Sequence, residues 1–281
     1  MSTSADSSGS RVAVVGAGFL GAPLARALGP GTVVASRSGT WRDDAPPDGV
    51  TLHPMDITAE TLAIDPLLRC DALHIAVAPG GADVDRRALY VEGVKRLLDA
   101  VAAHPWRRLV YVSSTSALPN ADGWIFESDA RRPQSERGAV QRDAEDLVLA
   151  YGRRRNIPTL VLRLGGLYGP GRDLGRVYRR RRDAPMAGSG KAPTNLIHVE
   201  DAVAASLAAL AAPAHVGGVI HVVDDDHQTR RAMYDALAQA RGIEPVAWEA
   251  AVGPEAPTGK RVSNLRLKLD LGVRLKHPTH G

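Results

Sequence analysis

The feature that most constrains this chain is an apolar run that leads directly into three glycines near the start. Residues 12–15 read Val-Ala-Val-Val, and Gly16, Gly18 and Gly21 follow with the spacing G-x-G-x-x-G before a segment of helical composition. A strand that turns through this spacing into a helix is the context in which the pattern predicts a dinucleotide-binding turn. An ordinary glycine-rich turn is the alternative interpretation.

Glycine is needed at each of these three positions for a different physical reason. Gly16 lets the chain turn sharply off the strand, Gly18 leaves room for a pyrophosphate beside the backbone, and Gly21 lets the helix pack closely on the sheet. The free N–H groups and the positive end of the helix dipole then face the phosphates. We therefore expect Gly16, Gly18, Phe19, Leu20 and Gly21 to contact the cofactor.

The end of the second predicted strand indicates which dinucleotide binds. Residues 32–36 form this strand, and Arg37 and Ser38 follow it, with Arg42 close behind. An acidic residue at this point typically binds the ribose hydroxyls of NAD, whereas an arginine forms a charged pair with the 2′-phosphate of NADP. The sequence therefore predicts that NADP(H) is preferred over NAD(H). The alternative is that Arg37 is a solvated loop charge.

Two further strand ends belong to the same predicted edge of the sheet. The third strand, 51–57, ends at Asp56 and Ile57, and Asp56 is expected to meet the adenine edge or to cap a following helix. The fourth strand starts at residue 72, is almost entirely apolar as a central parallel strand should be, and ends at Ala78 and Pro79. Ligands of such sheets bind at the carboxyl ends of the strands, so we expect these four residues to line the cofactor site.

The rest of the chain continues to alternate strands with helices, which predicts the α/β class. We expect a Rossmann-type, doubly wound parallel sheet with a small C-terminal substrate lobe. Further strands are predicted at 108–116, 159–163 and 219–223, and helices at 86–104 and 201–212. The expected organisation is a disordered tail at 1–10, a dinucleotide-binding domain at 11–164, and a mixed region at 165–281 that completes the sheet and forms the lobe.

Composition excludes several other classes of protein. The 281 residues are 44% hydrophobic, which is ample for a core, and a net charge of +4 does not point to nucleic acid. The single cysteine, Cys70, excludes an intramolecular disulfide and indicates a reducing compartment. The polar start lacks the pattern of a signal peptide, and no apolar stretch approaches the length of a membrane span. We expect a cytoplasmic protein that binds neither nucleic acid nor membrane.

Hydroxyl groups gather at the end of the strand 108–116. Ser113, Ser114, Thr115 and Ser116 follow an apolar run, which puts them at the edge where the nicotinamide is expected. Turn chemistry alone also explains such a cluster. The position favours hydrogen bonding to a substrate.

With these segments in place, the sequence resembles the short-chain dehydrogenase/reductase superfamily, in its extended, epimerase/dehydratase-like branch. Residues 14–21 resemble the glycine-rich turn of that branch, 90–98 its fourth-helix motif, and 112–115 the strand with its active-site Ser/Thr. The longer stretches 163–172 and 195–201 resemble its later motifs. The resemblance implies an NAD(P)-dependent enzyme, and it implies a homodimer formed through the helices after the fourth and fifth strands.

One motif of that branch has no counterpart in this chain. The family's catalytic Tyr-x-x-x-Lys is usually followed two residues later by Ala-Glu, and anchoring on Ala144 and Glu145 puts Arg137 and Gln141 at the tyrosine and lysine positions. In the family mechanism the tyrosine moves a proton and the lysine lowers the tyrosine's pKa. Arginine is a poor proton donor and glutamine is neutral. The resemblance is therefore closer to an atypical subgroup that lacks the pair.

Four residues are candidates for the catalytic work. Ser114 matches the family's active-site Ser/Thr, and Arg137 is suited to binding an anionic substrate or stabilising negative charge. Tyr168, just after the sixth strand, is a proton donor in one interpretation and a structural tyrosine in the other. His198 is a candidate acid or base, although a histidine in this setting more often orders a strand-to-helix junction.

Two charged runs allow more than one interpretation. The segment 172–191 includes Arg176 and the basic run 179–182, which either attracts a phosphate or carboxylate or forms a solvated helix face. The acidic triplet 224–226 resembles a metal cluster only superficially, because consecutive loop residues point in different directions. No metal is predicted.

These features together predict an NADP(H)-dependent oxidoreductase, or an epimerase/dehydratase-like enzyme, that acts on a small polar and anionic metabolite through a non-standard active site. Loss of the catalytic pair leaves two alternatives open. One is a catalytically inactive dinucleotide-binding regulator or sensor, and the other is a non-redox lyase or cyclase on the same fold.

Overall fold

The apolar runs of the sequence form the strands of one central sheet. The computed structural model describes residues 10–41, 45–80, 84–175, 185–249 and 259–280. The sheet has seven strands in the order β3-β2-β1-β4-β5-β7-β10, and each neighbouring pair is parallel. These strands are β1 (Val12–Val15), β2 (Val33–Ser36), β3 (Thr51–Pro54), β4 (Ala72–Ile75), β5 (Arg108–Ser114), β7 (Thr159–Leu164) and β10 (Gly218–Val222).

The order of the strands reverses between β1 and β4. From β1 the chain continues to β2 and β3 on one side, whereas β4, β5, β7 and β10 follow on the other side. Ligands of open α/β sheets bind outside the carboxyl ends of the strands at such a reversal. The segments 16–20 and 76–80, which follow β1 and β4, therefore border the expected crevice.

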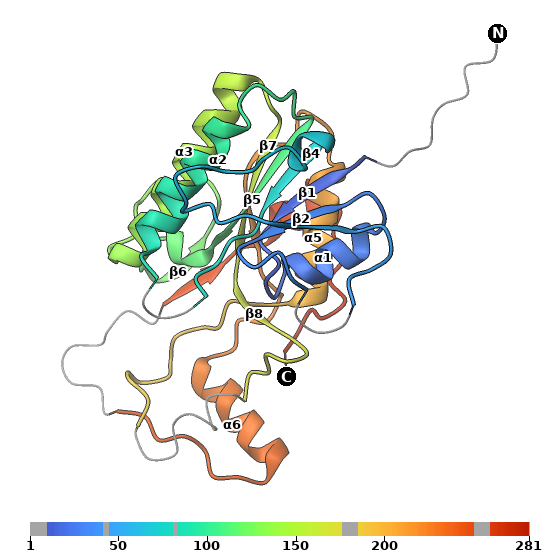
Figure 1. Cartoon of the computed structure of the whole chain (residues 1–281). Helices are drawn as coiled ribbons and strands as arrows, with labels where there is room; N and C mark the ends of the chain where they lie inside the picture. The colour runs from blue at the N-terminus through green and yellow to red at the C-terminus, as the bar shows by residue number, and fades with distance from the viewer. Residues whose placement is uncertain (1–9, 42–44, 81–83, 176–184, 250–258, 281) are drawn as a thin grey trace.

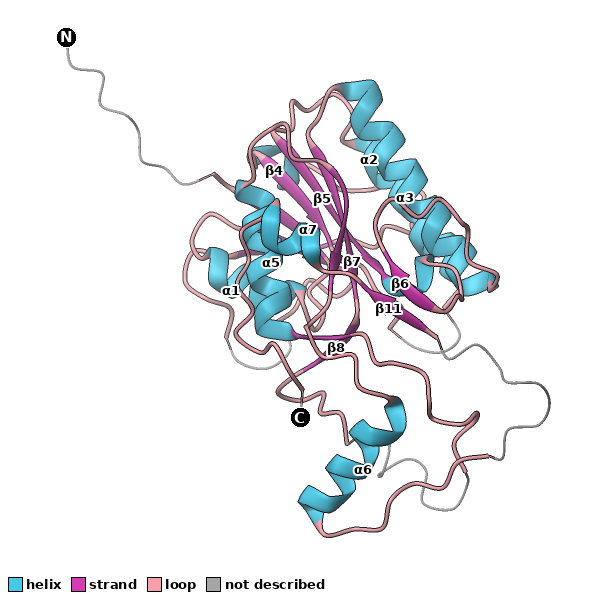
Figure 2. Cartoon of the chain, turned by 180° about the vertical axis from the view of Figure 1, so that it is seen from behind, coloured by secondary structure: helices cyan, strands magenta, loops and turns pink. Residues whose placement is uncertain are grey.

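Helices cover both faces of the sheet. α1 (Gly21–Leu28) and α5 (Val199–Ala211) pack together on one face, and α2 (Val94–Ala100) and α3 (Glu136–Arg155) pack together on the other (Figures 1 and 2). Side chains of a strand point alternately to the two faces. In β1, Val12 and Val14 accordingly join the apolar core under α1 and α5, and Ala13 and Val15 join the core under α2 and α3.

The helix predicted at 86–104 begins at residue 86, as predicted, but contains a π-helical turn and ends earlier. Residues 86 and 87 are α-helical, the π-helical turn η2 (Ala88–Gly93) follows, and the helix continues as α2 and ends at Ala100. Gly93 allows this start to lie against the segment after β3, because a Cβ there would be only 3.1 Å from the carbonyl oxygen of Ile57. The turn buries Tyr90, whose residue is 8% exposed.

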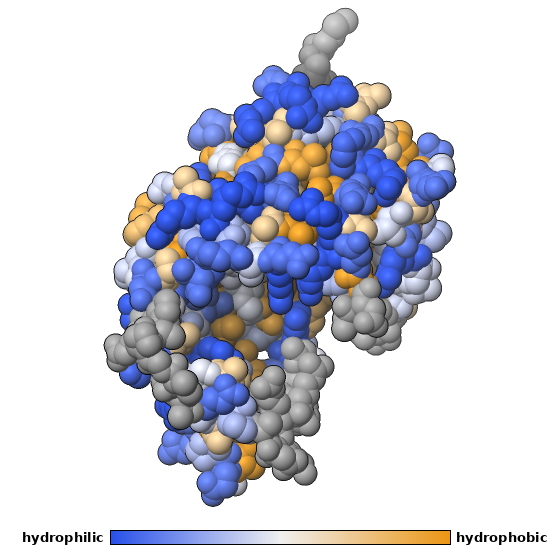
Figure 3. Space-filling model, turned by 90° about the vertical axis from the view of Figure 1, so that its left-hand side faces the viewer, coloured by the Kyte–Doolittle hydropathy of each residue, from blue (hydrophilic) through white to orange (hydrophobic). Residues whose placement is uncertain are grey.

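The first turns of α3 lie beside the end of β5. The helix starts after Ser135, whose hydroxyl accepts the N–H of Gly138 at 3.1 Å. A Cβ at Gly138 would come within 2.5 Å of the carbonyl oxygen of Ser116, so the two backbones are in close contact. This contact brings Arg137 and Gln141 to the carboxyl edge of the sheet. The exposed side of α2 and α3 faces the viewer in Figure 3 and is mostly hydrophilic.

Two small parallel sheets lie at the lower edge of the main sheet. β6 (Gly123–Ile125) pairs with β11 (Lys260–Val262), and β8 (Gly166–Tyr168) pairs with β9 (Leu196–His198). The lobe that contains α6 (Arg230–Arg241) lies below them in Figure 1. The other elements in the described part of the chain are η1 (Leu67–Arg69), η3 (Thr115–Ala117) and α7 (Leu265–Leu269).

The prediction of an α/β, Rossmann-type fold with a doubly wound parallel sheet is confirmed. β10 comes from the second half of the chain and pairs with β7, while the predicted domain boundaries stay predictions. Of the helices in the described residues, none has the length and apolar character needed to cross a membrane.

Candidate active site

The glycine-rich turn leads from β1 into α1 where the strand order reverses. Gly16 has a φ of +112°, and a Cβ there would collide with the carbonyl of Ala76 just after β4. Its N–H donates to the carbonyl of Ala35 in β2 at 2.7 Å. A Cβ at Gly21 would collide with the carbonyl of Gly16, whereas a Cβ at Gly18 would meet no atom within 4 Å. The open space at Gly18 fits the approach of a pyrophosphate to the helix N-terminus.

The two residues between these glycines differ in burial. Leu20 is 5% exposed and packs in the core under α1. Phe19 lies nearer the surface, where the guanidinium of Arg172 is stacked 5.4 Å from the centre of its ring. Both residues precede the first turn of α1, whose N-terminus favours a negatively charged ligand.

Asp56 and Arg37 lie close together after β3 and β2. Hydrogen bonds from the hydroxyl and the N–H of Thr58, at 2.7 and 2.9 Å, lower the pKa of Asp56, and the positive charge of Arg37 adds to this effect. Asp56 holds a turn, since residues 57–66 contain no helix for it to cap. The guanidinium of Arg37 occupies the space that a Cβ at Gly80 would need, so this cation reaches across to the end of β4.

The other residues that the sequence predicts to bind the cofactor follow the same strands. Ser38 is exposed after β2, and its hydroxyl is 2.7 Å from that of Thr40. Ile57 is buried after β3, and Ala78 and Pro79 follow β4. The structure therefore brings the predicted cofactor residues to one edge of the sheet, as parallel strands require.

A small polar cavity lies at the carboxyl end of β5. It has a volume of about 30 Å³, enough for about one or two water molecules. Ser114 from β5 and Arg137 from α3, both predicted as catalytic residues, lie on different elements and meet here. The lining residues are Arg86, Tyr90, Ser114, Ser116, Arg137 and Gln141.

Two buried polar atoms at the cavity have no partner among the described residues. These are Oε1 of Gln141 and Oγ of Ser116. The hydroxyl of Ser114 accepts the N–H of Ser116 at 3.2 Å, which leaves its own proton for another acceptor. Since buried polar groups in proteins are normally hydrogen-bonded, the cavity offers unused hydrogen-bonding capacity to a ligand.

Tyr90 lines the cavity, and the guanidinium groups of Arg86 and Arg137 lie near its phenol ring. Burial raises the pKa of Tyr90, and the positive charges of Arg86 and Arg137 act in the opposite direction. A tyrosine phenol has an ordinary pKa near 10, so this phenol is protonated at neutral pH, and burial makes it a weaker acid than a tyrosine in water.

A buried ion pair holds α3 against the sheet behind the cavity. Glu145 and Arg163 are 0% and 1% exposed, and Arg163 donates from Nη2 to Oε2 at 2.6 Å and from Nε to Oε1 at 2.9 Å. The hydroxyl of Ser113 also donates to Oε1, at 2.6 Å. Ser113 precedes Ser114, and Glu145 lies one helical turn after Gln141, so this network fixes the two sides of the cavity relative to each other.

Tyr168 and His198, the other two predicted catalytic residues, lie on the β8–β9 pair, with their ring centres 5.1 Å apart. Neither residue lines the cavity at the end of β5. The Nδ1 of His198 accepts the N–H of Glu200 at 3.3 Å, so His198 caps α5 and orders the strand-to-helix junction. Burial and the nearby His277 lower the pKa of His198. Burial, helped by the carboxylate of Asp224, raises the pKa of Tyr168 to about 12.

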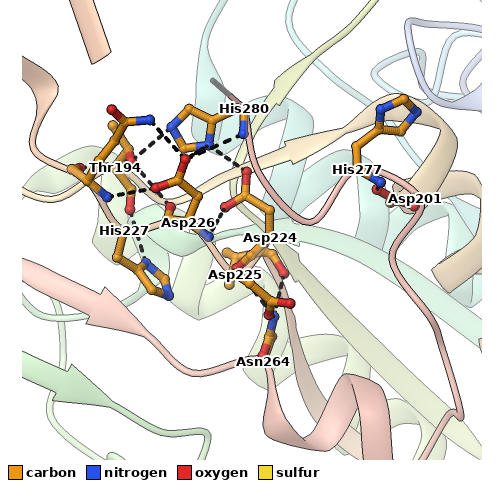
Figure 4. Close-up of polar contacts among 11 residues, drawn as sticks. Thr194, Asp201, Asp224, Asp225, Asp226, His227, Asn264, His277 and His280 are labelled. Atoms are coloured by element: carbon orange, nitrogen blue, oxygen red, sulfur yellow. Dashed lines mark hydrogen bonds and ion pairs between the residues drawn. The ribbon is translucent and has the colours of Figure 1, made fainter. Parts of the chain in front are cut away.

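The acidic triplet 224–226 binds the C-terminal segment of the chain through His280 (Figure 4). Its first and third carboxylates face Nδ1 of His280, at 2.8 and 3.6 Å, and its middle carboxylate accepts a hydrogen bond from Asn264 at 2.7 Å. Asp201 adds to this attachment, because its two oxygens accept the N–H groups of residues 276 and 277 at 2.7 and 2.9 Å.

Three of the lining residues, Arg86, Tyr90 and Ser116, are not predicted as site residues from the sequence. Ser116 belongs to the predicted hydroxyl cluster, and Tyr90 opens the stretch 90–98, but Arg86 has no signal in the sequence. Of the basic segment 172–191, the residues 176–184, which contain Arg176 and the run 179–182, lie outside the described residues.

Comparisons with known proteins agree with the fold. Residues 12–223 match the NAD dependent epimerase/dehydratase family. Protein YeeZ of Escherichia coli K12 is 30% identical over 95% of this chain and 96% of its own length. A 3-diazoavenalumate denitrifying reductase of a Streptomyces species is 30% identical over 72% of this chain and 71% of its own length.

A solved structure shares the fold at lower identity. UDP-glucuronic acid 4-epimerase from Bacillus cereus, in complex with NAD, superposes with a TM-score of 0.78 over 95% of this chain and 94% of that chain, at 18% identity. The match of residues 12–223, together with the full-length relative, shows that the chain belongs to the NAD-dependent epimerase/dehydratase family.

Proposed function

We propose that this chain is an NADP(H)-dependent oxidoreductase that acts on the carbonyl or hydroxyl group of a small, polar, anionic metabolite. The observation that supports this most directly is the cavity at the end of β5. Ser114 and Arg137, predicted from separate parts of the sequence, meet there beside a second guanidinium, that of Arg86. Two guanidinium groups and unpaired hydrogen-bonding atoms favour a substrate with a carboxylate or phosphate.

In this proposal Arg137 and Gln141 stand where the family's tyrosine and lysine would be. Both residues lie in the first two turns of α3, and both line the cavity. Ser114 and Arg137 hold the substrate oxygen, and the guanidinium stabilises negative charge that develops on it. The neutral side chain of Gln141 supplies a hydrogen-bonding group in place of a charge.

The cofactor assignment depends on the residues around the turn. The open space at Gly18 admits a pyrophosphate, and Arg37 supplies the cation that a 2′-phosphate would pair with. The bound dinucleotide supplies the hydride. The related 4-epimerase structure contains NAD, so Arg37 alone supports the preference for the phosphorylated form.

Nucleotide titration of the purified protein tests this function. The protein is titrated with NADPH and with NADH, and nicotinamide fluorescence is followed for the natural chain, for Arg37→Ala, and for Arg69→Ala as the control. Arg69 is an exposed arginine in η1, just before β4, and therefore near the opposite edge of the sheet. We expect Arg37→Ala to weaken NADPH binding roughly 10- to 100-fold, the value of a charged hydrogen bond, with little change for NADH.

The control and the alternatives have distinct outcomes. Arg69→Ala should leave both nucleotide affinities unchanged. Absence of binding for both nucleotides would overturn the proposal. Tight NADPH binding with no reduction of any carbonyl and no oxidation of any alcohol would instead favour the inactive regulator.

A further inference from the structure

The cavity at the end of β5 contains few groups that are able to give a proton. Among the residues that the structure describes, its lining has no carboxylate, imidazole or thiol. The guanidinium groups of Arg86 and Arg137 hold their protons far above neutral pH, and the amide of Gln141 does not ionise. The remaining groups are two serine hydroxyls and the phenol of Tyr90, and a phenol is by far the stronger acid of the two types.

The backbone places Tyr90 between the cofactor edge and α3. Tyr90 lies in the π-helical turn η2, a kind of irregularity that is frequent at functional sites. On one side this turn touches Ile57, the predicted cofactor residue after β3, through the close approach of Gly93. On the other side it packs against α3, the helix that presents Arg137.

The charges around Tyr90 suit a proton donor. The phenol is protonated at neutral pH, so it enters the reaction with a proton to give. The guanidinium groups of Arg86 and Arg137 then stabilise the phenolate that remains after the proton has left.

Two unpaired polar atoms belong to residues that line the cavity with Tyr90, and they are available for hydrogen bonds to a polar ligand. Gln141 is 6% exposed, and its Oε1 has no partner in the described part of the chain. The Oγ of Ser116 is also buried and has no hydrogen-bond partner among the described residues. A substrate oxygen in contact with the phenol would be surrounded by these groups and by Ser114.

We propose that Tyr90 is the catalytic proton donor of this site and takes over the work of the tyrosine that the family has at the position of Arg137. This inference rests on the proposed function. The carbonyl carbon of the substrate receives a hydride from a reduced nicotinamide dinucleotide, and the carbonyl oxygen receives the phenolic proton of Tyr90. Tyr90 then regains a proton from solvent, so one ketone, one NADPH and one proton give one alcohol and one NADP⁺.

The variant that tests this is Tyr90→Phe, and Tyr151→Phe is its matched control. Tyr151 is also a buried tyrosine, but it lies on α3 and is not among the residues that line the cavity. Both changes remove one oxygen and keep the ring, so both proteins should fold. Thermal unfolding of each variant checks this.

The first readout does not depend on turnover. The chain is produced with ¹³C at the Cζ carbon of its six tyrosines, and NMR spectra are recorded at neutral pH with NADP⁺ before and after addition of oxalate, a small dianion that suits two guanidinium groups. We expect oxalate to shift one resonance in the natural chain and in Tyr151→Phe. That resonance should be the one missing from Tyr90→Phe. A Tyr90 resonance that saturating oxalate leaves unmoved would overturn the inference.

The second readout is oxidation of NADPH with pyruvate, oxaloacetate and 2-oxoglutarate as carbonyl probes. We expect Tyr90→Phe to lower kcat at least roughly 100-fold, the range of general acid catalysis, and Tyr151→Phe to change it less than about twofold. A Tyr90→Phe protein that reduces a probe at the natural rate would refute the role of Tyr90 and leave the proposed function standing. Failure of the natural chain to bind NADPH would refute the proposed function itself. Where no probe is reduced, the NMR result decides.

Discussion

Replacing Glu145 by leucine tests whether the buried ion pair behind the cavity behaves as its geometry indicates. Arg163 is 1% exposed and donates three hydrogen bonds to Glu145, at 2.6, 2.9 and 3.1 Å. Without the carboxylate, the guanidinium of Arg163 would be buried with no counter-charge, and the hydroxyl of Ser113 would lose its acceptor. Breaking a buried pair in this way costs about 3–5 kcal/mol. For a chain of this size that corresponds to a fall in Tm of about 6–10 °C.

The assay is a double-mutant cycle read by urea unfolding. It compares Glu145→Leu, Arg163→Met and the double variant with the natural chain. Glu145→Leu leaves the buried guanidinium of Arg163 without its carboxylate, and Arg163→Met leaves Glu145 with the longer 4.0 Å contact to Arg142. The double change removes both buried charges, so the double variant should be less destabilised than the sum of the single variants by at least about 2 kcal/mol. Glu136→Leu, on the exposed first turn of α3, is the control and should cost less than about 1 kcal/mol.

Additive losses in this cycle would refute the argument. They would mean that Glu145 and Arg163 contribute independently and that α3 is held by its apolar contacts alone. The link to the site is tested with the same variants, because a looser α3 should also separate Arg137 and Gln141 from Ser114. Weaker oxalate binding by the double variant, with NADPH binding unchanged, would show that the pair positions the substrate side of the site.

Two further perturbations test the cofactor turn and a buried histidine. Gly18→Val should abolish NADPH binding in the fluorescence titration without a change in Tm, because the new side chain would fill the open space that the pyrophosphate needs; an unchanged affinity would contradict the assignment of the turn. Burial lowers the pKa of His74 to about 3 in the folded chain, whereas a histidine in the unfolded chain titrates near pH 6.5. Between these two pH values only the unfolded chain binds this proton. The free energy of unfolding should therefore fall by about 1.4 kcal/mol for each unit by which the pH is lowered from 6.5 to about 3. Urea unfolding of His74→Leu should show a smaller loss over that window, whereas the exposed control His215→Leu should keep the full slope.

The sheet and the cofactor turn could be predicted from the sequence because both depend on local patterns. Strands that are buried on both faces, such as β4 and β5, read as continuous apolar runs, and parallel pairing brings their ends to one edge. The turn needs glycine where the backbone has a positive φ or has no room for a Cβ, as at Gly16. Glycine in such a place is visible in a single sequence.

The rest of the site depends on contacts between distant segments. Periodicity predicts an ordinary helix at 86–104, and the π-helical turn that buries Tyr90 is formed where Gly93 meets Ile57, a contact between two elements. Tyr168 and His198 are candidates from their positions at strand ends, ranked after Ser114. Their surroundings are determined by the end of the chain, which returns to the triplet 224–226 through His280, and no local pattern indicates that return.

The two halves of the site therefore differ in what holds them. The cofactor half depends on the backbone conformation of the glycine-rich turn. Few substitutions leave that conformation intact, so this half has the glycine spacing of the family. The substrate half consists of side chains from η2, β5 and α3, and each of these is replaceable while the fold stays the same. In our proposal the proton donor has moved from α3 to Tyr90, and positive charge has moved with it, from the lysine position now held by Gln141 to Arg86 and Arg137. A neighbouring cation stabilises the phenolate that remains when a phenol gives up its proton, and in this proposal the two arginines provide that charge in place of the family's lysine.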